Sequence, residues 1–401
     1  MFEKINKPSN LTEALLPILI CNWTFGHQMI QCNQNNFVVL QKFFYFVFII
    51  CIYVITWSLA IVYSLSAAVA TYQENIYWVV IGVNAWIFFI NIILGLIFRN
   101  KARMIHIRCM RADKKLENLG VPVNNQRSFR YSLITTIIWI VTALLLNLLT
   151  IIWNIESDEI VVDSIITYTL HHPTHMNYLI DLTFCLLVHN MSIRFRKINK
   201  ALLKFTVLQS NDLILTKNNK LILDNRCGVC NQTSSRLSNS LHILKNIHLE
   251  LTTLCEKITN IFGVQIIMTT VSSFTLITAT LYDLFLTMKD PKIKNNEKIY
   301  EASVLLSWVV INIANFQFIN FISAQTVHEW DRTNKIIHKL ESQSQDTELC
   351  STIQKFALQM LQNPLKFSPC GFIDLGYPFV RDFAGTITTY LIILIQMAPN
   401  Q

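Results

Sequence analysis

Charged side chains are scarce in this chain, since Asp, Glu, Lys and Arg together make up 14% of its 401 residues. Apolar residues make up 52%, and the mean hydropathy is +0.39. A soluble protein of ordinary composition carries roughly a quarter charged residues. This composition excludes a water-soluble protein and indicates one that lies in a lipid bilayer.

Signals of several other protein classes are also missing. The first 40 residues contain no basic start followed by an apolar core and a cleavage site, so we expect no cleavable signal peptide. No cysteine falls in a predicted outer loop, which argues against a disulfide framework. Cys227 and Cys230 have zinc-type spacing, but nothing nearby completes four ligands, so we expect no metal and no cofactor. No motif unites a nucleophile, a base and an orienting group, which argues against an enzyme.

Seven apolar stretches are long enough to cross a bilayer, which takes about 20 helical residues. They are Phe43–Ser66, Tyr77–Phe98, Tyr131–Trp153, Met176–Ile193, Ile261–Met288, Ala302–Ala324 and Phe383–Ala398. Backbone groups in lipid must be paired within their own segment, and barrel strands would be shorter and alternating. The predicted fold is therefore an all-α polytopic membrane protein. The seventh stretch is short and partly polar, which predicts that it is surrounded by protein.

Basic residues set the expected orientation, because cytoplasmic loops carry the excess of Lys and Arg. With the N-terminus cytoplasmic and the C-terminus extracellular, 29 of the 33 Lys and Arg residues lie inside. Asn154–Leu170, an expected outer loop, has four acids and no Lys or Arg. The net charge of +8 is then explained by anionic membrane lipid, and we expect no nucleic-acid partner.

This topology divides the chain into six segments. They are a cytoplasmic N-terminal segment (1–42), spans one to four (43–193), a cytoplasmic helical loop (194–260), spans five and six (261–324), a second cytoplasmic helical loop (325–382), and the seventh span with a short tail (383–401).

The cytoplasmic segments contain helical seams of their own. Apolar residues recur at steps of three and four at Leu244, Ile247, Leu251, Leu254, Ile258 and Ile261, and again at Leu349, Ile353, Phe356 and Met360. Such a seam serves either assembly of subunits or a helical hairpin within one subunit, and periodicity does not choose between them. Leu11–Ile20 is a short apolar stretch that fits either the inner membrane surface or a buried turn.

The carboxy-terminal part of the chain resembles the insect gustatory receptors, in the superfamily that also includes insect odorant receptors. His248–Phe285 is similar to the helix that leads into and through the family's fifth span, and His328–Leu340 to the helix that follows the sixth. Phe356–Met397 resembles the closing signature, with a Thr-Tyr pair, five apolar residues and Gln396. Met397 stands where the family usually has Phe. Over the first 240 residues the resemblance rests on topology alone.

The resemblance implies a taste receptor that is a ligand-gated cation channel of four subunits, as a homotetramer or a heteromer with related receptors. The seventh helix would line a central pore for permeating cations, and the first six spans would form the wall that binds a small tastant. The implied location is the plasma membrane of a chemosensory neuron, with the N-terminus inside. The charge pattern reaches the same orientation independently.

The residues of the seventh span agree with a pore-lining role. Gly385, Thr388 or Thr389, Ile392 and Gln396 recur at three- or four-residue steps and share one face. Hydroxyls and amides can hold ions, while a ring of Ile closes the path by dewetting. Met397 would put a thioether at the pore mouth. The alternative is that Gly385 and its neighbours only allow close helix packing, and Tyr390 is expected to fix packing rather than touch ions.

A ligand pocket is expected in the outer halves of spans two to six. Amide, carboxylate and aromatic side chains fall there, including Asn84, Trp86, Asn147, Asn177, Asp181, Tyr282 and Trp308. Asp181 is the sharpest candidate, because a carboxylate inside a span faces a partner or a wet cavity. Interhelical hydrogen bonding is the alternative. His171, His172 and His175 could bind metal or sense pH, but a solvated start of a helix at Pro173 is the ordinary explanation.

Two other classes stay open. A seven-helix receptor coupled to a G protein would place its N-terminus outside, and its Asp-Arg-Tyr and Asn-Pro-x-x-Tyr motifs are missing here. A membrane transporter would show repeats with broken helices in both halves, which this sequence lacks.

Overall fold

The computed structural model describes residues 8, 10–27, 36–67, 72–154, 160–218, 227–289, 291, 294–344 and 347–397. Within these ranges all regular structure is helical, which confirms the expected all-α fold. The elements are α1 (Leu11–Ala14), α2 (Leu16–Thr24), α3 (Asn36–Ala67), α4 (Tyr72–Asn118), α5 (Asn125–Asn154), α6 (Ile160–Asn218), α7 (Cys227–Lys289), α8 (Asn295–Gln343), α9 (Thr347–Gln362), the 3₁₀ turn η2 (Pro369–Gly371) and α10 (Tyr377–Met397).

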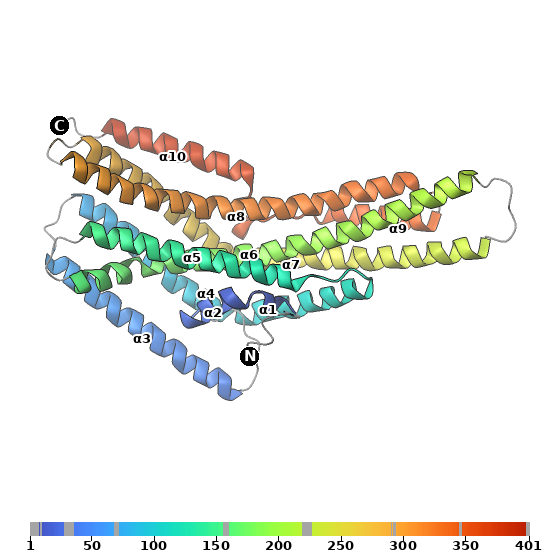
Figure 1. Cartoon of the computed structure of the whole chain (residues 1–401), viewed down its shortest axis with the longest axis horizontal. Coiled ribbons are helices and arrows are strands. Elements are labelled where there is room, and N and C mark those ends of the chain that lie inside the picture. Colours follow the sequence, from blue (N-terminus) through green and yellow to red (C-terminus); the bar gives the residue numbers. More distant parts are fainter. Residues whose placement is uncertain are drawn as a thin grey trace.

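Seven long helices run alternately up and down the molecule (Figure 1). α3, α5, α7 and α10 all finish at one end of the bundle, which we call the outer end after the charge pattern. Among the described residues, α4, α5, α7, α8 and α10 are long and apolar enough to cross a membrane, and α3 adds a shorter apolar stretch, Val47–Val62. The fourth expected span lies in α6, where residues 171–188 are buried throughout.

Three helices are too long for a bilayer alone. α6 has 59 residues, α7 has 63 and α8 has 49. At a rise of 1.5 Å per residue they are roughly 75–95 Å long, against about 30 Å of hydrocarbon. They therefore extend out of the membrane, and Figure 1 shows them continuing beside α9 at the end opposite the outer end.

The extension is held by the two apolar seams. Leu244, Leu251 and Ile258 are each 0% exposed, and the seam of α9 is buried as well. Gln359 Nε2 on α9 donates a hydrogen bond to the Lys245 carbonyl on α7 at 3.0 Å. These contacts lie within one chain, so the seams form the core of a hairpin of helices in the single subunit.

An ion pair at the root of this extension joins α6 to α4. Arg194 is 0% exposed, and its guanidinium donates to Asp113 through Nε at 2.8 Å and Nη2 at 2.7 Å. Its Nη1 donates to the Asn190 carbonyl at 2.8 Å. A bidentate pair of this kind is geometrically selective, so it sets the register between the two helices.

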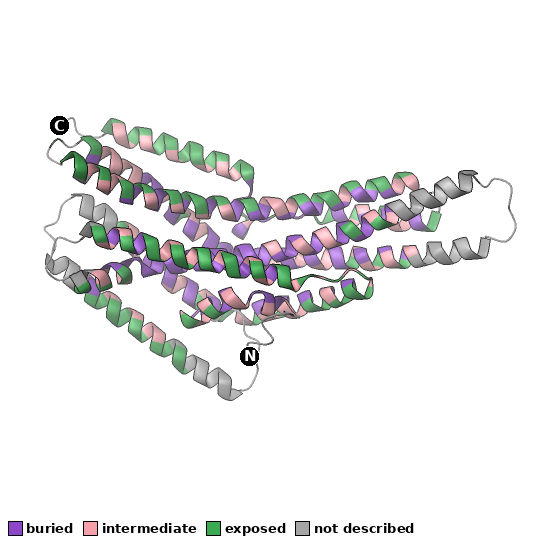
Figure 2. Ribbon diagram, in the orientation of Figure 1, coloured by how far each residue is buried: buried purple, intermediate pink, exposed green. Residues whose placement is uncertain are grey.

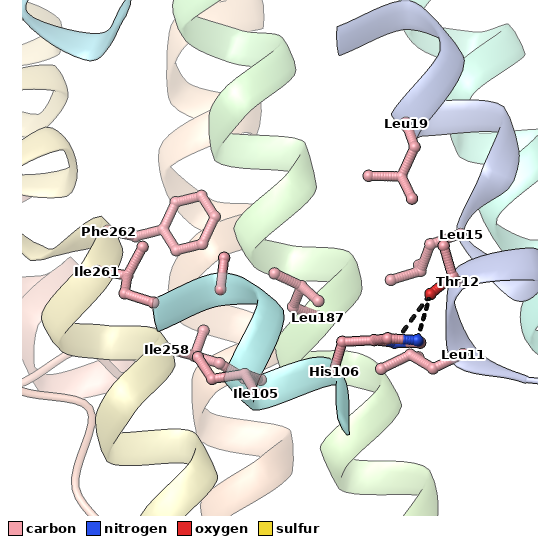
Figure 3. A pocket seen from close by; sticks show the side chains of 11 residues that line it. Leu11, Thr12, Leu15, Leu19, Ile105, His106, Leu187, Ile258, Ile261 and Phe262 are labelled. Carbon is pink, nitrogen blue, oxygen red and sulfur yellow. Dashed lines mark hydrogen bonds between the residues drawn. The ribbon is translucent and has the colours of Figure 1, made fainter. Parts of the chain in front are cut away.

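The two short helices α1 and α2 pack into the bundle rather than lying on the membrane surface. Leu11, Leu15 and Ile18 are at most 2% exposed, so the buried alternative for this stretch holds. Thr12 Oγ1 lies 2.8 Å from an imidazole nitrogen of His106 on α4, beside a cavity of about 20 Å³ (Figure 3). Farther along, Asn22 Nδ2 donates to Thr183 Oγ1 on α6 at 2.8 Å.

The start of the fourth span differs from the prediction. α6 begins at Ile160, so residues 160–170 of the expected outer loop are helical, and Pro173 lies inside the helix rather than in its first turn. Proline has no N–H and leaves the carbonyl four residues earlier without its helical partner. Here Trp57 Nε1 on α3 donates to that carbonyl, the Thr169 oxygen, at 3.2 Å. A neighbouring helix thus satisfies the group that the proline frees.

The last helix, α10, lies on the flank of the bundle. None of its residues is buried, and Figure 2 shows it as exposed or intermediate along its whole length. Within the single chain α10 contacts α7 and α8 on one side only, so its own chain does not supply the surrounding protein that the sequence predicts for this span. The rings of Phe316 on α8 and Phe383 on α10 stack with centroids 4.0 Å apart.

The loop before α10 is fastened to the bundle at two points. The Gly376 amide donates to Asn320 Oδ1 on α8 at 2.9 Å. At Gly263 on α7, an added Cβ would lie 3.2 Å from both the amide nitrogen and the Sγ of Cys370. Only glycine gives η2 this close approach, so these contacts fix where α10 starts.

Candidate functional site

Asp181 on α6 is the centre of a buried polar network. It is 0% exposed, and three side chains donate to its carboxylate: Gln265 Nε2 at 3.1 Å and Thr269 Oγ1 at 3.3 Å from α7, and Asn315 Nδ2 at 2.9 Å from α8. The carboxylate therefore ties three helices together. Its oxygens are satisfied by protein donors, as the interhelical alternative predicted.

One turn farther toward the outer end, Asn177 joins α6 to α4. Its Nδ2 donates to the Asn84 carbonyl at 3.1 Å, and its Oδ1 accepts from Asn91 Nδ2 at 3.1 Å. Ser272 Oγ on α7 donates to Asn84 Oδ1 at 3.2 Å. Asn84 and Asn177, which the sequence nominated separately, thus bond to each other one helical turn away from Asp181.

Asn147 and Trp308 lie in a second group, with two histidines of α6. His175 Nε2 is 3.2 Å from Asn147 Oδ1 on α5, and the Trp308 ring of α8 lies 4.8 Å from the His171 ring and 5.8 Å from the His175 ring, centroid to centroid. These histidines, with His172, are at most 7% exposed, so a solvated helix start was the wrong interpretation. They are buried because α6 begins eleven residues before His171.

An aromatic pocket of about 320 Å³ opens between α3, α4 and α6, beside the polar network. Its lining includes Tyr53, Trp57, Phe88, Tyr168 and His172. Tyr53 and Phe88 meet edge to face at 5.1 Å, and the His172 ring lies 5.0 Å from Tyr53. A cavity of this size with apolar walls and a few polar groups suits a small organic molecule.

Sequence reasoning missed this aromatic pocket, although Trp57 and the paired histidines were visible signals. Their common location depends on how far α6 extends toward the outer end, which Pro173 obscured. Of the other nominated ligand residues, Trp86 is 73% exposed and points away from both groups, and Tyr282 is half-buried on α7. Neither joins the network.

Possible metal ligands do not cluster in the part of the chain that can be described. No group of three or more His, Cys, Asp or Glu side chains there could hold an ion. The side chains of Cys227 and Cys230 lie outside the described residues.

The uncovered face of α10 holds the residues nominated for a pore. Gly385, Thr388, Thr389, Ile392 and Gln396 are all exposed, and Met397 is 76% exposed. Phe383, Ile387 and Leu391 turn toward the bundle on the opposite face. Tyr390 is 53% exposed, with its ring edge to face against Phe274 of α7 at 5.5 Å. Thr389 donates its hydroxyl proton to the Gly385 carbonyl at 3.0 Å.

Comparison with curated proteins finds taste receptors of Drosophila melanogaster. The chain is 26% identical over 156 residues to "Gustatory receptor for sugar taste 43a", over 39% of this chain and 35% of that protein. It is 24% identical over 167 residues to "Gustatory receptor for bitter taste 66a", over 41% of this chain and 31% of that protein. The chain therefore spans about a third of the length of these relatives.

Comparison with solved structures finds the insect olfactory receptor OR5 from Machilis hrabei. Its complex with eugenol matches 96% of this chain and 98% of its own, with a TM-score of 0.63 and 12% identity. A second structure of the same receptor matches with a TM-score of 0.54 and 16% identity. At such low identity the likeness establishes the seven-span fold alone.

The sequence profile of a family described as "7tm Chemosensory receptor" matches residues 15–401, nearly the whole chain. This match agrees with a multi-pass membrane receptor and not with an enzyme. The chain belongs to the 7tm chemosensory receptor family.

Proposed function

We propose that this chemosensory receptor is a taste receptor whose chains assemble, four around one axis, into a cation channel opened by a small tastant. The single observation that carries the proposal is the uncovered α10. This helix presents exposed Thr389 and Gln396 on the face away from its own bundle. An amide such as that of Gln396 is costly against lipid but is accommodated beside water or another protein chain.

In the proposed assembly, four copies of α10 face one another across the axis. Threonine oxygens and the Gln396 amides supply ligands for permeating cations, because these side chains are exposed on the face of α10 away from the bundle. A ring of Ile392 side chains forms the apolar constriction that stops conduction by dewetting. Met397 gives the outer mouth a flexible thioether in place of an aromatic ring.

The ligand is proposed to bind in the outer half, where Asn147 of α5 and Trp308 of α8 lie beside the α6 histidines, near the polar residues that join α4, α6, α7 and α8. Asn147 and Trp308 would contact it directly, with the aromatic pocket as the neighbouring volume. Asn84, Asn177 and Asp181 would then transmit binding, because they join the helices that must move. Ring faces and amides suit either sugar hydroxyls or a cationic bitter compound.

Orientation gives the first test. We place the receptor in the plasma membrane of a chemosensory neuron, with its N-terminus inside. An epitope tag at Met1 should become accessible to antibody only after cells are permeabilised. Staining of intact cells would instead fit a receptor coupled to a G protein.

Calcium entry into cells that express the full chain tests channel activity, with a panel of sugars, bitter compounds and amines. The Gln396→Ala variant should change ion selectivity or gating at normal expression. The matched control is Gln317→Ala, because Gln317 is also exposed but lies on α8. Saturating currents without single-channel openings would fit a transporter, and an unchanged Gln396→Ala channel would remove α10 from the pore.

A further inference from the structure

A basic pocket lies between the start of α5 and the middle parts of α6 and α8. Its volume is about 540 Å³. Five of the side chains that line it are cationic: Arg127 and Arg130 from α5, and Arg196, Lys197 and Lys200 from α6. No Asp or Glu is among the lining residues.

The positive charge of the basic pocket is largely unbalanced. Arg196 is paired with Glu329, whose Oε1 accepts from its Nε at 2.9 Å. No described carboxylate forms an ion pair with Arg127, Arg130, Lys197 or Lys200. Burial, with the nearby charges of Lys200 and Lys204, lowers the pKa of Lys197. A bound anion would relieve this repulsion.

The basic pocket lies at the depth where a lipid headgroup would meet it. Its residues stand at the expected inner start of span three and the inner end of span four. Ile134, which is 57% exposed, and Ile193 line the side toward the membrane, together with Tyr131, whose ring stacks on His189 at 4.3 Å. Cations at one side and apolar groups at the other match a phosphorylated headgroup with its acyl chains.

We propose that the basic pocket binds a multiply phosphorylated headgroup, the chemistry shared by anionic inositol lipids and soluble inositol phosphates. Arg127 and Arg130 suit phosphate oxygens because a guanidinium donates two parallel hydrogen bonds, and Lys197 and Lys200 add point charges. The inference goes beyond the proposed function, because this binding requires neither a tastant nor ion conduction.

The test measures binding to the purified full chain in detergent. The probes are short-chain phosphatidylinositol bisphosphate, soluble inositol trisphosphate and short-chain phosphatidylcholine. The double variant Arg130→Gln with Lys200→Gln should bind the bisphosphate lipid about 25-fold more weakly, because each of two lost cations contributes about a factor of five. Raising the salt concentration should also weaken binding to the unaltered protein.

The matched control is Lys335→Gln with Lys339→Gln, which removes two exposed cations from the extension of α8 outside the basic pocket. This control should bind within about twofold of the unaltered protein, since screened distant charges contribute little. Equal elution and melting temperature of both variants verify that they fold.

The three probes distinguish the source of the headgroup. Tighter binding of the bisphosphate lipid than of inositol trisphosphate supports a membrane lipid, and equal binding supports a soluble phosphate in the same basic pocket. The proposal is overturned if phosphatidylcholine binds as well as the bisphosphate lipid, or if pocket and control variants lose affinity equally.

Discussion

At the scale of single residues, the interior is defined by polar groups whose partners lie on other helices. Asp181 accepts from α7 and α8, Arg194 donates to α4, and the carbonyl freed by Pro173 accepts from α3. Each pairing avoids the cost of a polar group buried without a partner. Such groups select one arrangement of helices, because apolar contacts alone tolerate several.

The Arg194 pair gives the largest expected effect of one substitution. Asp113→Ala would leave a fully buried guanidinium without its carboxylate, which costs about 3–5 kcal/mol. The measurement is the apparent free energy of unfolding in detergent. Lys115→Ala is the control, because Lys115 is half exposed and its pair with Glu250 should contribute about 0–1 kcal/mol. Equal losses in both variants would contradict the assigned role.

Trp57 gives a second test at this scale. Trp57→Phe keeps an aromatic ring but removes the N–H that bonds the Thr169 carbonyl. An unpaired carbonyl at this depth should cost about 1–3 kcal/mol of stability. Trp86→Phe is the matched control, since Trp86 is 73% exposed, and its melting temperature in detergent should not change. If the Trp57→Phe protein were as stable as the control, the hydrogen bond from Trp57 would not be what satisfies the carbonyl that Pro173 leaves free.

The network also predicts a change in ligand response. In Asp181→Asn an NH₂ group replaces one carboxylate oxygen. This NH₂ group cannot accept the hydrogen bond that a side chain of α7 or α8 donates to that oxygen. We expect a shifted dose response of the expressed receptor at normal surface level. A response equal to that of the unaltered receptor would take Asp181 out of the ligand-sensing group.

At the scale of elements, α9 is an amphipathic helix held by one apolar face. Phe356 is 0% exposed and meets the ring of His248 on α7 at 5.4 Å, whereas Leu361 is 78% exposed. Phe356→Ala should therefore destabilise the extension by about 3–5 kcal/mol. Leu361→Ala, on the opposite side, should change stability by less than about 0.5 kcal/mol. Urea titration of the purified protein compares the two.

At the scale of the whole molecule, α10 raises the question of what covers its outward face. Gly385 has open space where a Cβ would be, with no heavy atom within 4 Å in the single chain. Gly385→Leu should therefore leave the single chain stable. If four copies of α10 meet, the added side chain should block close approach and reduce the current at least tenfold.

Gly82→Leu is the matched control for this substitution, because Gly82 also lies in a helix with nothing within 4 Å of an added Cβ. Its current and its assembly should be unchanged. Native mass measurement should give four chains for the unaltered receptor and fewer for Gly385→Leu. A single-chain mass for the unaltered receptor, or full current in Gly385→Leu, would contradict the proposed assembly.

The sequence by itself determined an all-helical fold of apolar spans, because apolar length and backbone pairing leave helix as the only form a span can take. It also predicted the seams of α7 and α9, since a periodic apolar face must be buried somewhere. It misplaced the start of α6, because a proline such as Pro173 usually marks the first turn of a helix. The helix continues through Pro173 because Trp57, a residue distant in the chain, donates a hydrogen bond to the carbonyl that the proline leaves free.

Only the tertiary structure decided which polar residues meet. Asn177 bonds Asn84, which is 93 residues away in the sequence, and the partners of Asp181 are 84 residues or more away. These bonds depend on the relative rotation of α4, α6, α7 and α8. The convergence of cations from α5 and α6 on one pocket was likewise invisible to composition, which counts charges without placing them. The physical reason is that helical periodicity specifies a face, whereas the neighbour of that face is chosen by the packing of the whole bundle.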